Sequence, residues 1–193
     1  MSKQYTERAF EQAIEYDLTN GGGFAVVDKD SYDVKRAIFP EEVLAFIKET
    51  QPDEWAYLEN IQKDEAKTAL LDALCDALGS TNIGCLAVLR HGFKCFGKTF
   101  HVAFFQPASQ MNPDTVARYN ANRLGITRQL HHSINHPNDS LDVTLSVNGI
   151  PVITIELKNP MTGQMWRNAV HQYKHDRDAK DLIFQFKKRS LVH

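Results

Sequence analysis

Residues 140–160 read SLDVTLSVNGIPVITIELKNP, and the rest of the chain is best interpreted outward from this segment. Apolar and polar residues alternate on both sides of its Asn148-Gly149 pair. Such alternation is typical of β-strands with one buried face, and Asn-Gly is typical of a tight turn. The sequence therefore predicts a β-hairpin whose two strands each have an apolar and a polar face.

The polar faces of the two strands carry Asp142, Glu156 and Lys158. A two-residue turn would set Asp142 opposite Ile155 and separate it from Glu156. A three-residue turn with Gly149 in a left-handed bulge, or a five-residue turn, brings all three side chains to one face. Because a slip of one residue would turn every apolar side chain outward, burial favours this register. We therefore predict a turn of odd length.

Two carboxylates and a lysine on one face suit phosphate chemistry. Carboxylate oxygens are ligands of Mg²⁺, which binds through one or two of them and keeps waters and phosphate oxygens as its other ligands. A nearby ammonium such as that of Lys158 can orient the attacking water or take part in its deprotonation. The alternative is that Glu156 and Lys158 are only exposed charges on a solvated strand face.

The remaining segments predict further helices and strands. Helical spacing and helix start or stop signals indicate helices over 7–18, 40–51, 62–78 and 166–177. Strands are expected at 24–27, in the branched and aromatic stretch from Ile83 to Phe105, and at 182–186, whereas 107–136 has a mixed character.

Composition places limits on the class of protein. A chain of 193 residues with 42% hydrophobic and 24% charged residues is typical of one folded domain, taken as 1–193. A formal net charge of -2 gives no basic surface as evidence for nucleic acid. The three cysteines match neither a zinc site nor a disulfide framework, and the sequence has no long apolar run or signal peptide. We expect a cytoplasmic protein without a membrane partner.

Two other motifs are candidates for functional sites. Residues Gly92–Thr99, GFKCFGKT, fit the phosphate-loop pattern, but strand-like residues follow Lys98 where that motif needs a helix. A hairpin turning at Gly97-Lys98 is the favoured interpretation, and a nucleotide-binding protein is kept as the less favoured one. The histidine pairs 171/175 and 132/136 lack the glutamate of a zinc motif, so structural histidines are expected.

The pattern Asp142, then Glu156-Leu157-Lys158, resembles the D…(D/E)-x-K signature of restriction-endonuclease-like nucleases. The segments TERAFEQAIEYDL, TQPDEWAYL, NGIPVITIELKNP and AVHQYKHDRD together resemble the N-terminal nuclease domain of the restriction subunit of type I restriction-modification enzymes. The similarity covers nearly the whole chain. It implies an α/β fold in which a central mixed sheet is flanked by helices.

The resemblance also implies roles for individual residues. Asp142, Glu156 and the carbonyl of Leu157 would hold Mg²⁺, with Mn²⁺ as a substitute, and Lys158 would act on the nucleophilic water. Related nucleases place a glutamate from the first helix near the metal, which matches Glu11, with Glu7 as the alternative.

The helix after the lysine strand departs from the family pattern. Relatives carry glutamine followed four residues later by tyrosine, whereas Gln172 is followed by Asp176. Gln172 stays a candidate for the active site, but no tyrosine occupies the position that the family pattern requires. Lys174 and Arg177 are candidates for contacts with DNA phosphates.

In this family the nuclease domain precedes an ATP-driven motor and assembles with methylation and specificity subunits. This sequence contains no motor, so we expect an N-terminal fragment of a longer subunit that uses ATP only through the missing region. The resulting hypothesis is a Mg²⁺-dependent endonuclease acting on double-stranded DNA. The alternative from another class is a catalytically silent assembly or DNA-docking module with the same fold.

Overall fold

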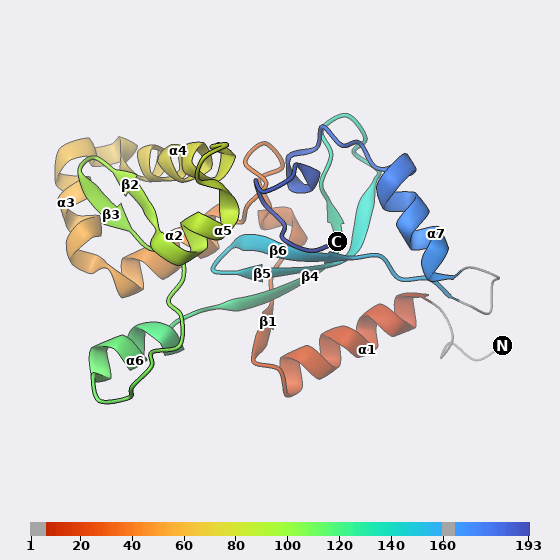
Figure 1. Ribbon diagram of the computed structural model, residues 1–193, viewed down its shortest axis with the longest axis horizontal. Helices are drawn as coiled ribbons and strands as arrows, with labels where there is room; N and C mark the ends of the chain where they lie inside the picture. The colour runs from red at the N-terminus through yellow and green to blue at the C-terminus, as the bar shows by residue number, and fades with distance from the viewer. Residues whose placement is uncertain (1–6, 160–164) are drawn as a thin grey trace.

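A mixed four-stranded sheet lies at the centre of the computed structural model, which describes residues 7–159 and 165–193 (Figure 1). Its strands, in spatial order, are β1 (Phe24–Val26), β4 (Leu124–His131), β5 (Ser140–Val147) and β6 (Ile150–Ile155). β1 runs parallel to β4, and the other two pairings are antiparallel. The predicted mixed α/β fold is confirmed.

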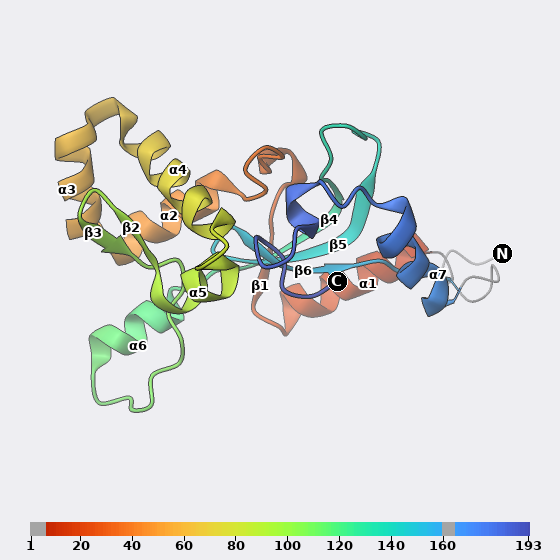
Figure 2. The ribbon, with the colours of Figure 1, turned by 45° about the horizontal axis from the view of Figure 1, so that its top comes forward.

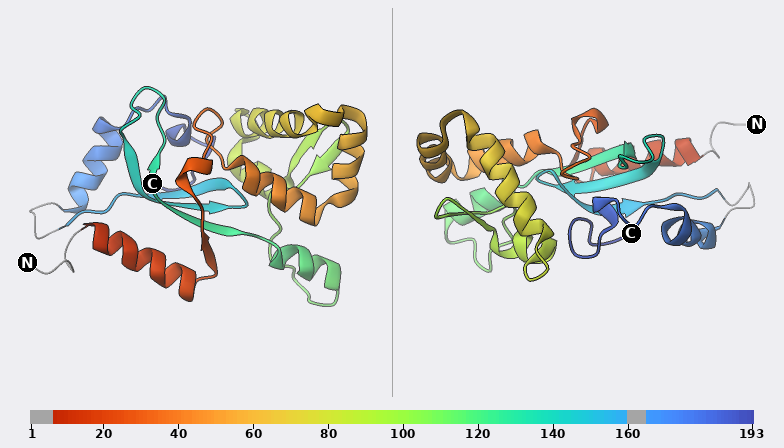
Figure 3. Two further views of the ribbon diagram at one scale, coloured as in Figure 1. Left: turned by 180° about the vertical axis from the view of Figure 1, so that it is seen from behind. Right: turned by 90° about the horizontal axis from the view of Figure 1, so that it is seen from above.

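Helical segments cover the two faces of this sheet (Figure 3, right). On one face, α1 (Glu7–Asn20) packs Ile14 and Leu18 near Ile126 and Val143. On the other face lie α7 (Trp166–His171), a π-helical turn (Gln172–Asp176) and a 3-10 turn (Leu182–Phe184). Tyr173 and Ile183 from these segments belong to the same apolar cluster as Leu141. The sheet is therefore enclosed by segments from both ends of the chain.

A helical lobe lies beyond one end of the sheet in Figures 1 and 2. It contains α2 (Pro40–Thr50), α3 (Pro52–Gln62), α4 (Ala66–Gly79), α5 (Gly84–His91) and the hairpin β2 (Phe93–Cys95) and β3 (Lys98–Phe100). Short 3-10 turns occupy Lys29–Ser31 and Lys63–Glu65, and α6 (Pro113–Asn120) leads back to the sheet. The amide N–H of Phe39 donates to the carbonyl of Gly149 at 2.8 Å, which joins the lobe to the β5–β6 turn.

The β5–β6 turn corrects the predicted odd length. Val147 pairs with Ile150, so Asn148 and Gly149 form a two-residue turn, both with positive φ. A bulge at Leu145/Ser146 then shifts the register, and Val143 pairs with Ile155. This register places Asp142 across from Glu156. The turn prediction was wrong, but the bulge brings the two carboxylates together as the buried apolar face requires.

Several element predictions also need correction. α3 and β4 were not predicted, and the strand expected at 182–186 is a 3-10 turn over Leu182–Phe184 followed by a bend and a turn, with Phe186 84% exposed. Part of the expected strand region is helix α5, because Cys85, Val88 and Leu89 repeat at helical spacing and are all buried.

The Gly92–Thr99 segment is a hairpin in which Cys95 pairs with Lys98. Lys98 begins strand β3, and its Nζ lies 4.8 Å from the centre of the Tyr57 ring. No helix starts at this lysine, so the phosphate-loop alternative is wrong.

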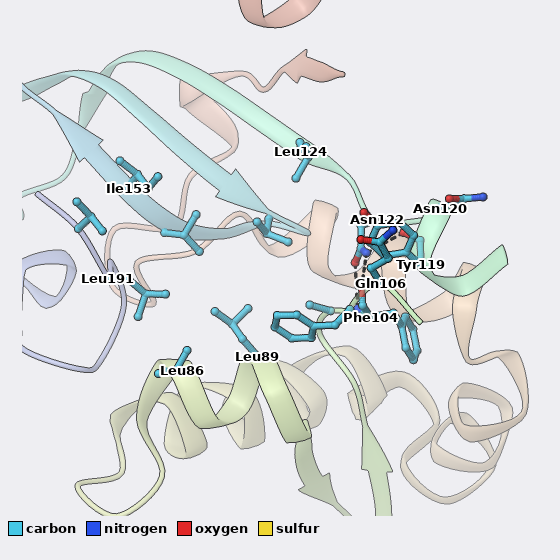
Figure 4. Close-up of a pocket in the computed structure, with 15 residues that line it drawn as sticks. Leu86, Leu89, Phe104, Gln106, Tyr119, Asn120, Asn122, Leu124, Ile153 and Leu191 are labelled. Atoms are coloured by element: carbon cyan, nitrogen blue, oxygen red, sulfur yellow. Dashed lines mark hydrogen bonds between the residues drawn. The ribbon is translucent and has the colours of Figure 1, made fainter. Parts of the chain in front are cut away.

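An apolar pocket of about 730 Å³ separates α5 from the sheet (Figure 4). Leu86 and Leu89 line one side, Ile153 lies on the sheet side, and Leu191 of the C-terminal segment closes another. Within the described parts of the chain, every helix lacks the length or the apolar character needed to cross a membrane.

Candidate functional site

Asp142 lies near the start of β5, at the opposite end of the strand from the turn. Its Oδ2 accepts a hydrogen bond of 2.7 Å from the amide of Leu157, the residue between Glu156 and Lys158. Its Oδ1 accepts a bond of 3.2 Å from Nε2 of Gln129. Asp142 is thereby held beside the segment that carries the other two predicted site residues.

Glu156 directly follows β6 and is buried, with 1% of its side chain exposed. Burial raises the pKa of this carboxyl to about 7, against the lowering effect of the Arg177 charge and hydrogen bond. The nearby Asp142 raises the pKa further, and Lys158 lowers it. Glu156 therefore sits where an additional positive charge would stabilise its ionised form.

Arg177 forms the ion pair with Glu156 through Nη2, and the same group donates to the carbonyl of Ser140 at 2.7 Å. Only 7% of its side chain is exposed. This guanidinium is buried against a carboxylate and belongs to the acidic cluster. Its predicted contact with DNA phosphates stays a prediction.

Glu11 is the buried residue of α1, with an exposed fraction of 3%. Gln129 Nε2 donates to its Oε1 at 2.8 Å, which links it to Asp142 through one amide group. Its Oε2 is buried without a hydrogen bond, 3.7 Å from Nη1 of Arg128. Burial raises the pKa of Glu11, and the Asp142 charge adds to that rise while Gln129 opposes it.

Glu7, the alternative acid of the first helix, has a different environment. Its Oε1 accepts a 3.0 Å hydrogen bond from the amide of Asn159, the residue after Lys158. Glu7 therefore fixes the end of the segment that carries Lys158, whereas Glu11 lies beside Asp142. This geometry favours Glu11 over Glu7 as the acid near a metal.

The remaining predicted residues occupy the edges of the cluster. Lys158 is half-buried two residues after Glu156, and Gln172 is half-buried at the start of the π-helical turn. Lys174 is exposed on that turn. The hydroxyl of Tyr173 donates to Oγ1 of Thr154 at 3.0 Å, and the ring packs against the sheet.

The oxygen donors around Asp142 fit a hard divalent cation. The buried Oε2 of Glu11 lacks a hydrogen bond, and the pKa values of Glu11 and Glu156 are raised chiefly by burial, with the Asp142 charge adding to the rise. Across residues 7–159 and 165–193, no three His, Cys, Asp or Glu side chains converge closely enough to hold a metal by themselves. Carboxylate oxygens are among the ligands that a divalent cation such as Mg²⁺ takes, together with water.

Gln129 is the cluster residue that the sequence did not predict. It lies on β4, flanked by the pairs Arg128–Val143 and Leu130–Leu141, so it is level with Asp142. Leu124, Ile126 and Leu130 have the spacing of one strand face, but the polar run Thr127–Gln129 interrupts the alternation, so the signal for this strand is weak. Without β4, nothing in the sequence relates Gln129 to Asp142.

The fold and the cluster define a class of protein, a mixed α/β domain with buried carboxylates and a lysine at one end of its sheet. The sequence matches the family described as type I restriction enzyme R protein N terminus over residues 4–189. The chain belongs to this family, which confirms the resemblance and implies a role in restriction. No curated protein and no solved structure matches it significantly.

Proposed function

We propose that this chain is a metal-dependent endonuclease domain that hydrolyses DNA phosphodiester bonds for a type I restriction enzyme. The observation that carries the proposal is the register that sets Asp142 across from Glu156, with Lys158 two residues further on. Family membership supports a restriction role, and the buried carboxylates support a site for a divalent cation.

Asp142, Glu156 and the carbonyl oxygen of Leu157 would hold Mg²⁺ or Mn²⁺, with Glu11 contributing from α1. The bound cation supplies positive charge that stabilises the negative charge developing on the phosphate in the transition state. The Leu157 amide keeps Asp142 oriented toward this position through the 2.7 Å hydrogen bond. Burial in the cluster limits competition from bulk water for the same oxygens.

Lys158 acts on the attacking water in this proposal. Its ammonium stabilises the hydroxide that forms when the attacking water loses a proton to solvent. As the bond from this oxygen to phosphorus forms, the bond from phosphorus to the leaving sugar oxygen breaks, and that oxygen takes up a proton from solvent. Gln172 contributes to the active site, and the exposed Lys174 contacts a DNA phosphate.

The partners follow from the family. We propose double-stranded DNA as the substrate and the methylation and specificity subunits as assembly partners, in the cytoplasm. ATP would act only through a motor region of a longer subunit, with residues 1–193 forming its nuclease domain. The near-neutral net charge of this chain is consistent with a nuclease domain in a larger assembly, because other parts of that assembly would supply most of the affinity for DNA.

The proposal is tested with Lys158→Ala in the full-length subunit assembled with its partners. We expect DNA cleavage to fall at least a hundredfold, as for loss of one group that stabilises charge in the transition state, while ATP hydrolysis is unchanged. Lys67→Ala is the control, because Lys67 is exposed on α4 in the helical lobe. Cleavage that survives in Lys158→Ala at the control level refutes the assigned role.

A catalytically silent DNA-docking module is the second candidate, and one observation favours it. Arg177 already neutralises Glu156, so this carboxylate is paired without any metal. Cleavage by the assembled enzyme separates the two functions. A silent module predicts that Asp142→Asn leaves restriction unchanged, whereas the nuclease predicts that restriction is lost.

A further inference from the structure

Gln129 has a backbone conformation that is unusual for its position. It lies within β4, yet its φ is +51°, in the left-handed region that favours glycine. A non-glycine residue persists there only when its surroundings hold it, and such residues concentrate at functional sites. The change in backbone direction also releases its side chain from the regular alternation of the strand.

The side-chain amide of Gln129 forms hydrogen bonds with Glu11, Asp142 and Ser140. Nε2 donates to Oε1 of Glu11 at 2.8 Å and to Oδ1 of Asp142 at 3.2 Å. Its Oε1 accepts from Oγ of Ser140 at 2.8 Å, which fixes the orientation of the amide. One neutral group therefore joins an acid of α1 to an acid of β5.

We propose that Gln129 is a positioning residue that holds Glu11 and Asp142 at the separation needed to share one divalent cation. This inference rests on the proposed nuclease function. The buried Glu11 and half-buried Asp142 carboxylates repel each other, and a neutral donor links them without supplying the charge that a cation would supply. The neighbouring Arg128 pairs with Glu11 through Nη1 at 3.7 Å and with Glu15 through Nε at 2.8 Å, so it contacts the acids of α1, whereas Gln129 joins Glu11 to Asp142.

The test measures Mn²⁺ affinity and stability of this chain together. Gln129→Gly removes the amide but suits the positive φ, so we expect its free energy of unfolding in urea to exceed that of Gln129→Met, which also lacks the donor and keeps the unfavourable φ. We expect the Kd for Mn²⁺, measured from the electron paramagnetic resonance signal of the free ion, to rise about tenfold, as for other groups that orient metal ligands. Gln129→Met, which keeps the side-chain length without a donor, should raise the Kd similarly and serves if the glycine variant does not fold.

Phe96→Gly is the matched control, because Phe96 also has a positive φ of 46° but is 51% exposed in the β2–β3 turn. Its Mn²⁺ affinity should equal that of the wild type. If the wild type binds Mn²⁺ and both Gln129 variants bind it within twofold of that affinity, the role of Gln129 is overturned. If the wild type itself does not bind millimolar Mn²⁺, the proposed function fails.

Discussion

Glu156 and Arg177 form a buried ion pair whose two side chains have little contact with water. Removing two charges from water costs free energy, which their attraction and the additional bond from Arg177 to Ser140 offset. Such a pair contributes little net stability, but loss of one partner leaves the other charge buried.

Arg177→Met should destabilise the protein by about 3 kcal/mol at pH 8, because it leaves the Glu156 carboxylate without its buried partner. The double variant Glu156→Gln/Arg177→Met should recover most of that loss, since a neutral amide costs less to bury. Urea unfolding of both variants and the wild type measures this coupling. Equal stability of the single and double variants would contradict the assigned ion pair.

The predictive power of the sequence differs among the site residues. Asp142, Glu156 and Lys158 were found because alternation along a strand assigns each side chain to a face. The positions of the Gln129 and Arg177 side chains depend on contacts with other elements, Glu11 on α1 and Ser140 on β5. The local pattern of apolar and polar residues contains no information about contacts with distant elements.

At the scale of elements, the β5–β6 hairpin shows why the turn was mispredicted. Burial of one face requires an extra residue in the hairpin, but this requirement does not say where that residue lies. The chain keeps the two-residue turn typical of Asn148-Gly149 and places the extra residue, Val152, at the bulge. The shared face was predictable, whereas the position of the irregularity was not.

Gly149→Ala should cost at least 2 kcal/mol of unfolding free energy. Its φ is +83°, and an added Cβ would lie 2.5 Å from the carbonyl oxygen of Phe39 and 2.9 Å from the amide nitrogen of Val43. Gly97→Ala is the control, since Gly97 has a φ of +81° but open space around it, so only about 1 kcal/mol is expected. Thermal or urea unfolding measures the difference, and equal losses would rule out tight packing at this turn.

The loop after β4 is joined to the 3-10 turn at Leu182–Phe184 by a buried polar cluster. Oγ of Ser133 donates to Asp181 at 3.0 Å, and Nδ1 of His132 lies 3.2 Å from the same carboxylate. The His132 ring also packs edge-on to Phe184. Burial lowers the pKa of His132, with the Arg177 charge acting in the same direction and Asp181 opposing it.

The lowered pKa of His132 predicts that the folded protein loses stability in acid. Because folded His132 binds its proton more weakly than unfolded His132, its contribution to stability is full above the ordinary histidine pKa of about 6.5 and is lost as pH falls below it. His132→Gln should lower stability at pH 8 through lost packing, yet flatten the decline between pH 7 and pH 5. Urea unfolding across this range checks the slope, and parallel curves for variant and wild type would contradict the explanation.

At the scale of the molecule, the sheet and its flanking helices were predictable but their connections were not. β1 pairs in parallel with β4, and the two strands are separated in sequence by the whole helical lobe. Nothing local to Phe24–Val26 specifies that partner. Similarly, α5 was assigned to strands because the aromatic residues that follow it dominate the composition of that region.

Net charge gives only limited information about DNA binding by a domain of this kind. The formal charge of -2 includes Glu11, Asp142 and Glu156, whose negative charges are the ones that a metal would balance. A bound cation therefore makes the active end of the sheet less negative than the sequence indicates. Exposed Lys174 lies on the turn next to this end.

The central claim is that Asp142 and Glu156 jointly hold a catalytic metal ion. Crystals of this chain soaked in Mn²⁺ test it most directly, because anomalous scattering locates the ion without reference to activity. We predict an anomalous peak between the Asp142 and Glu156 carboxylates, within coordination distance of the Leu157 carbonyl oxygen. The absence of a peak there at millimolar Mn²⁺ would contradict the claim and favour the silent docking module.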